Sequence, residues 1–239
     1  MNIKQNVCVV FRGELLRNPL SSYHNNGIGK SVREYDLSEE SFTRQNNIME
    51  SIITHIIIPY ENIGYNVFIS GCVYDGHNYN KKLTDFFPNN TITQIKSGKT
   101  NQAELFYRSI DHAEKKHPNC IEYISIRADY IMLKNIIRKD LGNLYTGFSW
   151  KNNNIPQVDV FFIISKNTIN ILKKILCTIG NKKKYTHTHS IYRYLQKNKV
   201  RLYPIWTNYE DKPTGISYKE YINDIKMHEN RPFVNYMRR

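Results

Sequence analysis

An arginine and an aspartate stand two positions apart at the end of an apolar segment, residues 120–129. Alternation along an extended chain places Arg127 and Asp129 on one face and three apolar side chains on the other: Ile124, Ile126 and Ala128. Open α/β sheets bind ligands at the carboxyl ends of their strands. A cation and a carboxylate delivered there together predict a site for a phosphorylated ligand.

The same pair has a structural alternative. Asp129 could cap a helix that begins near Tyr130, and Arg127 could pair with it or with another acid. However, an arginine on a strand otherwise built of isoleucine and tyrosine is costly unless it reaches water or a ligand. This cost favours the functional interpretation.

A second candidate group ends the first apolar segment: Phe11, Arg12, Gly13 and Arg17. Glycine lets backbone N–H groups approach a ligand closely, and the planar guanidinium of arginine suits phosphate oxygens. The alternative is an ordinary turn with surface arginines. If the two strands are adjacent and parallel, this group and Arg127 lie at the same edge of the sheet.

Two further carboxylates follow the same logic. Asp159 opens a strand over residues 158–164, where it could act as a catalytic base or simply finish the preceding loop. Asp75 follows the second strand and could bind a base or a sugar, although a turn residue is the commoner role.

Other motifs carry less weight. Residues 24–31 and 93–100 imitate a phosphate-binding P-loop, but the first lacks its leading glycine and the second begins inside a strand. Thr100 or Asn101 is better explained as a helix cap, with Glu104 completing a capping box after Asn101. His187 and His189 could share a metal ion, but no carboxylate or cysteine accompanies them, which favours a solvated loop.

The elements that must position these residues alternate between strands and helices. Strands are predicted at 6–11, 65–71, 91–95, 120–129 and 158–164. Helices are predicted from Ser38 to just before Pro59, and at 101–116, 132–139, 167–179 and 190–197. The segments 12–37 and 144–150 are expected to be loops. The pattern predicts an α/β fold with a mainly parallel central sheet and helices on both faces. We expect one domain over residues 1–239, with 181–239 as a basic C-terminal elaboration.

The composition points to anionic partners in a reducing compartment. The 239 residues carry a formal net charge of +13, which favours anionic partners, with a solvated basic surface as an equal alternative. They are 40% hydrophobic, enough for a sizeable core. The four cysteines form no closely spaced pair, and three lie in apolar segments, as buried thiols do. We find neither a signal peptide nor a membrane span and expect a cytosolic protein.

The order of these features resembles a loose group of glycosyltransferase-like proteins of bacteria and large DNA viruses, in which a strand ends in Arg-x-Asp. The resemblance covers roughly residues 6–180 and implies a GT-A-like fold, a nucleotide-diphosphate sugar as donor and a hydroxyl acceptor such as a glycan. Arg127 and Asp129 match the Arg-x-Asp of this group. The turn that carries Arg12, Gly13 and Arg17 matches the turn after its first strand, and Asp159 matches the acid that opens its late strand. A metal ion, Mn²⁺ or Mg²⁺, is implied at Asp129, although the plain Asp-x-Asp of GT-A enzymes is absent.

The resulting hypothesis assigns each residue a role in glycosyl transfer. Arg12, Arg17 and Arg127 contact the diphosphate, Asp129 holds a divalent ion or a sugar hydroxyl, and Asp159 is the base. A basic nucleic-acid-binding module is the main alternative, supported by the charge and the aromatic residues. A nucleotide-dependent kinase is a third possibility.

Overall fold

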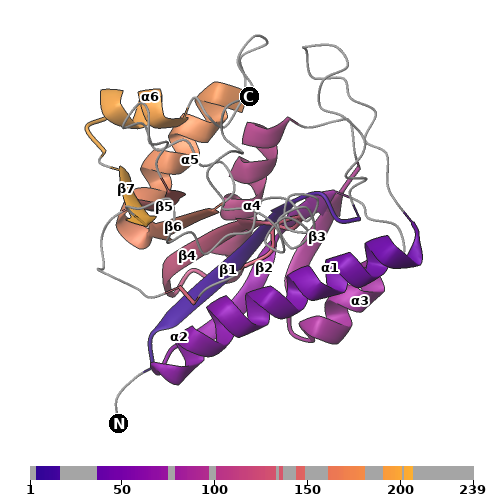
Figure 1. Cartoon of the computed structure of the whole chain (residues 1–239). Helices are drawn as coiled ribbons and strands as arrows, with labels where there is room; N and C mark the ends of the chain where they lie inside the picture. The colour runs from indigo at the N-terminus through magenta and orange to yellow at the C-terminus, as the bar shows by residue number, and fades with distance from the viewer. Residues whose placement is uncertain are drawn as a thin grey trace, which may run out of the picture.

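In a computed structural model, the described residues form a seven-stranded sheet with helices on both of its faces (Figure 1). The structure describes residues 4–16, 37–74, 79–96, 101–132, 135–136, 144–148, 161–180, 191–200 and 202–206. The strand order is β3-β2-β1-β4-β6-β5-β7. Strands β1 to β4 are mutually parallel, and β6 is antiparallel to both of its neighbours. The predicted α/β class, with a mainly parallel sheet between helices, is confirmed.

The strands of the described chain are β1 (Asn6–Gly13), β2 (Asn66–Tyr74), β3 (Thr91–Ile95), β4 (Cys120–Arg127), β5 (Leu144–Phe148), β6 (Phe161–Ser165) and β7 (Leu202–Trp206). The helices are α1 (Glu39–Ile52), the π-helical turn η1 (Ile53–Ile57), α2 (Ile58–Asn62), α3 (Tyr79–Phe86), α4 (Gln102–Lys116), α5 (Lys166–Gly180) and α6 (Ile191–Lys197).

The buried strands β1 and β4 alternate between two hydrophobic cores. Val9 and Ile124 pack with α1, η1 and α3 on one face, whereas Val10 and Tyr123 pack with α4, α5 and α6 on the other. Figure 1 shows α1 and α3 lying together on one side of the central strands. Because side chains of a strand point to opposite faces in turn, the faces predicted for residues 123–128 are confirmed.

The strand register brings several chain segments to one edge of the sheet. Arg12 of β1 lies opposite Arg127 of β4 and opposite Cys72 of β2. Since β6 runs antiparallel to β4, its first residue, Phe161, pairs with Ile126 near the end of β4. The start of β6 therefore lies at the same edge as the ends of β1, β2 and β4.

The first helical segment continues past the point where the sequence predicts its end. Ser38 caps α1 as expected, accepting a hydrogen bond from the Ser41 N–H at 3.1 Å. We expected the segment to stop before Pro59, but the chain passes through the π-helical turn η1 and Pro59 lies in the first turn of α2. Proline has no N–H to donate, and it is accommodated where the π-helical turn interrupts the regular α-helical hydrogen-bond pattern; the Ile58 N–H just before it donates to the Ile53 oxygen, five residues back.

Three expectations for the second half of the chain are corrected. Residues 144–150 were expected to be a loop, but Leu144–Phe148 is strand β5. No strand was predicted over residues 202–206, yet Leu202–Trp206 pairs in parallel with β5 as strand β7. The described residues between 132 and 136 are not helical, since the Ile136 N–H donates to the backbone oxygen of His55 at 2.9 Å.

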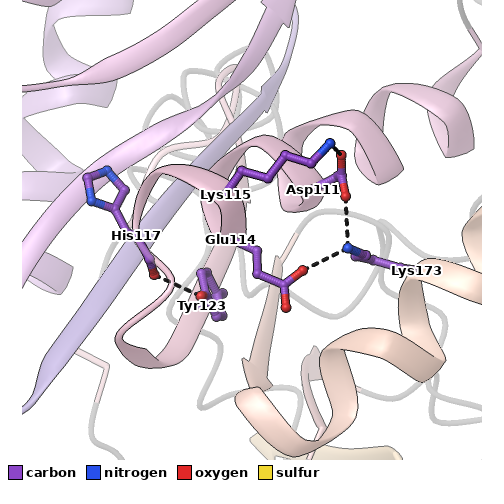
Figure 2. Close-up of polar contacts among 6 residues, drawn as sticks. All are labelled: Asp111, Glu114, Lys115, His117, Tyr123 and Lys173. Carbon is purple, nitrogen blue, oxygen red and sulfur yellow. Dashed lines mark hydrogen bonds and ion pairs between the residues drawn. The ribbon is translucent and has the colours of Figure 1, made fainter.

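Polar contacts at two places hold α5 against α4 and its N-terminal cap. At the edge that carries the strand ends, the Asn101 side chain accepts from the Glu104 N–H at 2.9 Å and donates to the Gly180 oxygen at 3.0 Å. Further along, the Lys173 ammonium of α5 lies 2.8 Å from Asp111 and 2.7 Å from Glu114 (Figure 2). Although partial burial opposes the change, hydrogen bonds from lysines lower the pKa of Asp111. These contacts fix the helix that follows β6, and thus support the edge where β6 begins.

None of the helices in the described part of the chain combines the length and the apolar character needed to cross a bilayer.

Candidate active site

Arg127 and Asp129 form a two-point ion pair at the end of β4. Arg127 Nε donates to Asp129 Oδ1 at 2.9 Å, and Nη2 donates to Oδ2 at 2.5 Å. The side chains are 13% and 9% exposed, so the pair is largely sheltered but reaches the surface. The Arg127 guanidinium also lies 5.0 Å from the centre of the Tyr130 ring. The pairing of Arg127 with Asp129 is the structural alternative given for these residues, and both lie at the expected edge of the sheet.

Arg12 lies beside Arg127 but deeper in the protein. Arg12 is only 3% exposed. Its Nε donates to the Ser125 hydroxyl at 3.1 Å, and its guanidinium carbon lies 4.2 Å from the centre of the Phe106 ring. Because Arg12 and Arg127 are register partners on parallel strands, two guanidinium-bearing residues flank one another at this edge. The site thus holds two guanidinium groups and the Asp129 carboxylate in a partly buried setting, where Coulomb interactions are stronger than in water.

The other two described residues of the first-strand turn are placed differently. The Phe11 side chain is fully buried on the opposite face, with its ring 5.4 Å from that of Phe87. Gly13 has φ of 99°, a conformation that L side chains rarely adopt, and it lies against the Arg127 side chain. Phe11 therefore anchors β1 in the core, while Gly13 allows the chain to turn at the site.

Three predicted residues lie outside the described residues: Arg17, Asp75 and Asp159. Each adjoins a described segment that reaches the site's edge. Arg17 follows Leu16, Asp75 follows the last residue of β2, and Asp159 precedes β6 by two positions.

Sequence reasoning missed three residues that support the site: Ser125, Phe106 and Gln45. Ser125 shares the strand face of Arg127, but a serine carries no signal of binding an arginine. Phe106 belongs to the predicted apolar stripe of α4, and its role over Arg12 needs the tertiary structure. Gln45, on the buried side of α1, contacts the backbone at two strand ends.

The described residues do not make a metal site. Both Asp129 oxygens accept hydrogen bonds from Arg127, and no group of three or more histidine, cysteine, aspartate or glutamate side chains clusters in the described part of the chain. Divalent ions such as Mg²⁺ prefer several oxygen ligands. The described donor set therefore does not fit a Mn²⁺ or Mg²⁺ ion.

A second buried carboxyl lies at the far end of β4. Glu122 is 2% exposed, and its Oε1 accepts a hydrogen bond from the Tyr60 hydroxyl at 2.6 Å. Burial raises the pKa of Glu122 to about 7, with the Tyr60 hydrogen bond acting in the opposite direction. Because β4 runs from Glu122 toward Arg127, this carboxyl is separated from the candidate site by the length of the strand and affects stability instead.

Comparison with known proteins finds similarity in structure alone. No family model and no curated protein sequence matches the chain. A glycosyltransferase involved in glycosylating the major capsid of PBCV-1 is similar, with a TM-score of 0.51 at 12% identity, covering 92% of this chain and 98% of that one. This similarity shows a shared fold.

Two other solved structures are similar at lower TM-scores. One is a putative nucleotide-diphospho-sugar transferase from Desulfovibrio desulfuricans G20, with a TM-score of 0.48, 7% identity, and coverage of 83% of this chain and 78% of that one. The other is the apo form of the glycosyltransferase GlyE from Streptococcus pneumoniae TIGR4, with a TM-score of 0.47, 14% identity, and coverage of 84% and 45%.

Proposed function

We propose that this protein is a glycosyltransferase that moves a sugar from a nucleoside-diphosphate sugar to a hydroxyl group of an acceptor such as a glycan. The observation that carries the proposal is the paired position of Arg12 and Arg127, with Asp129, at the carboxyl ends of adjacent parallel strands. That edge is where α/β sheets bind nucleotides. The fold shared with a capsid-glycosylating enzyme supports the same assignment.

The first chemical requirement is a cationic partner for the departing diphosphate. A guanidinium group can donate two parallel hydrogen bonds to phosphate as it does to carboxylate. In the proposal, the Arg127 guanidinium turns from Asp129 to the diphosphate. Arg12, held by Ser125, adds positive potential behind it, and Arg17 contributes from the adjoining turn.

The second requirement is a base for the acceptor. The bond between the sugar carbon and the diphosphate oxygen breaks, and a bond from that carbon to the acceptor oxygen forms. The acceptor's proton passes to the Asp159 carboxylate, and the diphosphate leaves with the bonding electrons. Asp129, released from Arg127, accepts a hydrogen bond from a donor sugar hydroxyl, and Asp75 contacts the base or ribose of the donor.

A binding screen tests the proposed class directly. Thermal melting is measured with UDP-, GDP- and other nucleotide sugars, with ATP, and with random oligonucleotides, since a ligand that binds the native state raises the melting temperature. The proposal predicts stabilisation by at least one nucleotide sugar and by its nucleoside diphosphate. Stabilisation by oligonucleotides alone, with steep salt dependence, would instead identify a nucleic-acid-binding protein. Stabilisation by ATP alone would point to a kinase.

A further inference from the structure

The side-chain amide of Gln45 links the two strand ends that form the candidate site. Gln45 lies on α1 and is only 3% exposed. Its Nε2 donates to the backbone oxygen of Ala128 at 2.7 Å, just after β4, and its Oε1 accepts from the N–H of Leu16 at 3.0 Å, just after β1. One side chain from a distant helix therefore touches both backbone segments.

The contact with Ala128 falls at the residue that separates the ion pair. Ala128 stands between Arg127 and Asp129, and its own N–H donates to the Arg12 oxygen at 2.8 Å. The backbone between the two charged residues is therefore held from both sides, by β1 through the N–H and by α1 through the carbonyl. This holds the two side chains in place relative to the sheet.

The contact with Leu16 stabilises an unfavourable backbone conformation. Leu16 has φ of 50°, in the left-handed region, and is 1% exposed. A non-glycine residue in that region is strained, and the surroundings must offset the strain. The Gln45 carbonyl accepts the Leu16 N–H, which would otherwise be a buried donor in need of a partner. Arg17 follows directly in the sequence.

A side chain of amide chemistry suits both contacts in this geometry. Ala128 offers an acceptor and Leu16 a donor, so the bridging group needs a donor and an acceptor at one end. Glutamine has both, ionised glutamate has only acceptors, and methionine has a similar length but makes only weak hydrogen bonds.

We infer that Gln45 is a positioning residue, which sets the geometry of Arg127 and Asp129 for the diphosphate through the Ala128 carbonyl. The inference rests on the proposed function. It extends that function to a residue with no part in the chemistry.

Ser51 provides a matched control on the same helix. Its hydroxyl accepts from the Met132 N–H at 2.9 Å, so it holds the same segment beyond the ion pair. Ser51→Ala removes one buried hydrogen bond between α1 and this segment but leaves Ala128 in place. A residue that acts on stability alone would behave as Ser51 does.

The test compares Gln45→Glu, Gln45→Met and Ser51→Ala for binding of UDP and GDP by calorimetry, and for amide hydrogen exchange at Leu16. Gln45→Met is expected to weaken diphosphate binding about tenfold and to speed exchange at Leu16, whereas Ser51→Ala stays within about twofold of wild type. Gln45→Glu is expected to keep Leu16 protected, because it retains the acceptor, and to lose affinity at about pH 8. Relative to wild type at the same pH, its affinity should recover at about pH 5.5, because burial at this position favours the protonated carboxyl, which can donate to Ala128.

The outcomes separate the two proposals. If the wild-type protein binds diphosphate and the Gln45 variants bind as Ser51→Ala does, the positioning role is wrong and the proposed function stands. The positioning role is also wrong if Gln45→Glu loses affinity equally at both pH values. If the wild-type protein binds no nucleoside diphosphate, the proposed function fails and takes the positioning role with it, while exchange at Leu16 still reports whether the Gln45 contact exists. Should Gln45→Met fail to fold, Gln45→Glu alone decides.

Discussion

Arg127 donates two hydrogen bonds to Asp129, although only one residue separates them along the chain. In this arrangement the carboxylate occupies the donors that, in the proposed reaction, bind a diphosphate. The two anions therefore compete for one guanidinium group. Because of this competition, removing the Asp129 carboxylate should raise the affinity for diphosphate, whereas removing a residue that binds the ligand directly would lower it.

Asp129→Asn is expected to bind UDP or GDP about tenfold more tightly than the wild type while losing sugar transfer. The substitution weakens the competing contact to Arg127 and removes a negative charge beside the diphosphate. Calorimetry measures the affinity, and a coupled assay of released diphosphate measures transfer.

The matched control for charge is Asp111→Asn, in the network between α4 and α5 (Figure 2). It makes the same change in net charge away from the site and should leave the affinity within about twofold. Weaker binding in Asp129→Asn, or full transfer activity, would refute the competition.

Arg12→Met is expected to weaken diphosphate binding about threefold to fivefold, because it removes a positive charge next to Arg127 while keeping an apolar stem over Phe106. Ser125→Ala serves as the comparison, since it removes only the hydroxyl that holds Arg12. A hydrogen bond to a charged group is worth about 1.5–3 kcal/mol, so Ser125→Ala should lower the melting temperature by several degrees and the affinity little. Equal affinity in Arg12→Met and wild type would show that Arg12 is structural.

The stability of the protein should fall as the pH rises through the range set by Glu122. Its pKa is raised from 4.5 to about 7 in the folded protein, so the folded state binds a proton more tightly than the unfolded state. This contribution is complete below about pH 4.5 and is lost as the pH approaches 7 and above. At about 1.4 kcal/mol per pKa unit, ionisation costs up to about 3 kcal/mol.

Two variants isolate this effect in chemical denaturation between pH 5 and 8. Glu122→Gln should flatten the decline and be more stable than wild type at pH 8, by about 1–3 kcal/mol. Tyr60→Phe should steepen the decline, because the Tyr60 hydrogen bond holds the pKa of Glu122 down. An unchanged pH profile in Glu122→Gln would locate the titration elsewhere.

The Arg127–Asp129 ion pair also bears on whether diphosphate binding needs a metal ion. Because Arg127 is the proposed partner of the diphosphate, binding of UDP or GDP should survive chelation by EDTA, with affinity within about threefold of that in Mn²⁺. If Mn²⁺ does strengthen binding, the resemblance-based assignment of the ion to Asp129 predicts that Asp129→Asn abolishes the gain. Binding that needs Mn²⁺ in both proteins would contradict both expectations.

Much of the site's framework could be predicted from local patterns. Alternation in 120–129 predicted that Arg127 and Asp129 lie together, and their side chains do meet, although the strand ends at Arg127 and Asp129 lies in the turn after it. The central position of β1 followed from its short, continuous apolar run. A cap of α4 was predicted at Thr100 or Asn101, because such a side chain needs only a local N–H partner, and Asn101 provides it. These features depend on neighbours in the sequence.

What could not be predicted depends on contacts between distant segments. Periodicity predicts a strand near Phe161 but not its direction, and the antiparallel direction of β6 brings its start to the site. The glycine and polar residues of Leu144–Phe148 resemble a loop until β6 and β7 pair with them. A single glutamine on a helix, such as Gln45, has no pattern that reveals its partners 29 and 83 positions away.

The central claim is that Arg127 holds the diphosphate of the donor. Calorimetric titration of UDP and GDP into the wild type and into Arg127→Met, with the matching nucleosides as controls, tests it most directly. We expect the wild type to bind at least one diphosphate more tightly than its nucleoside, and Arg127→Met to lose this preference with a drop in affinity of at least about tenfold. Equal affinity for the diphosphate in the two proteins would contradict the claim.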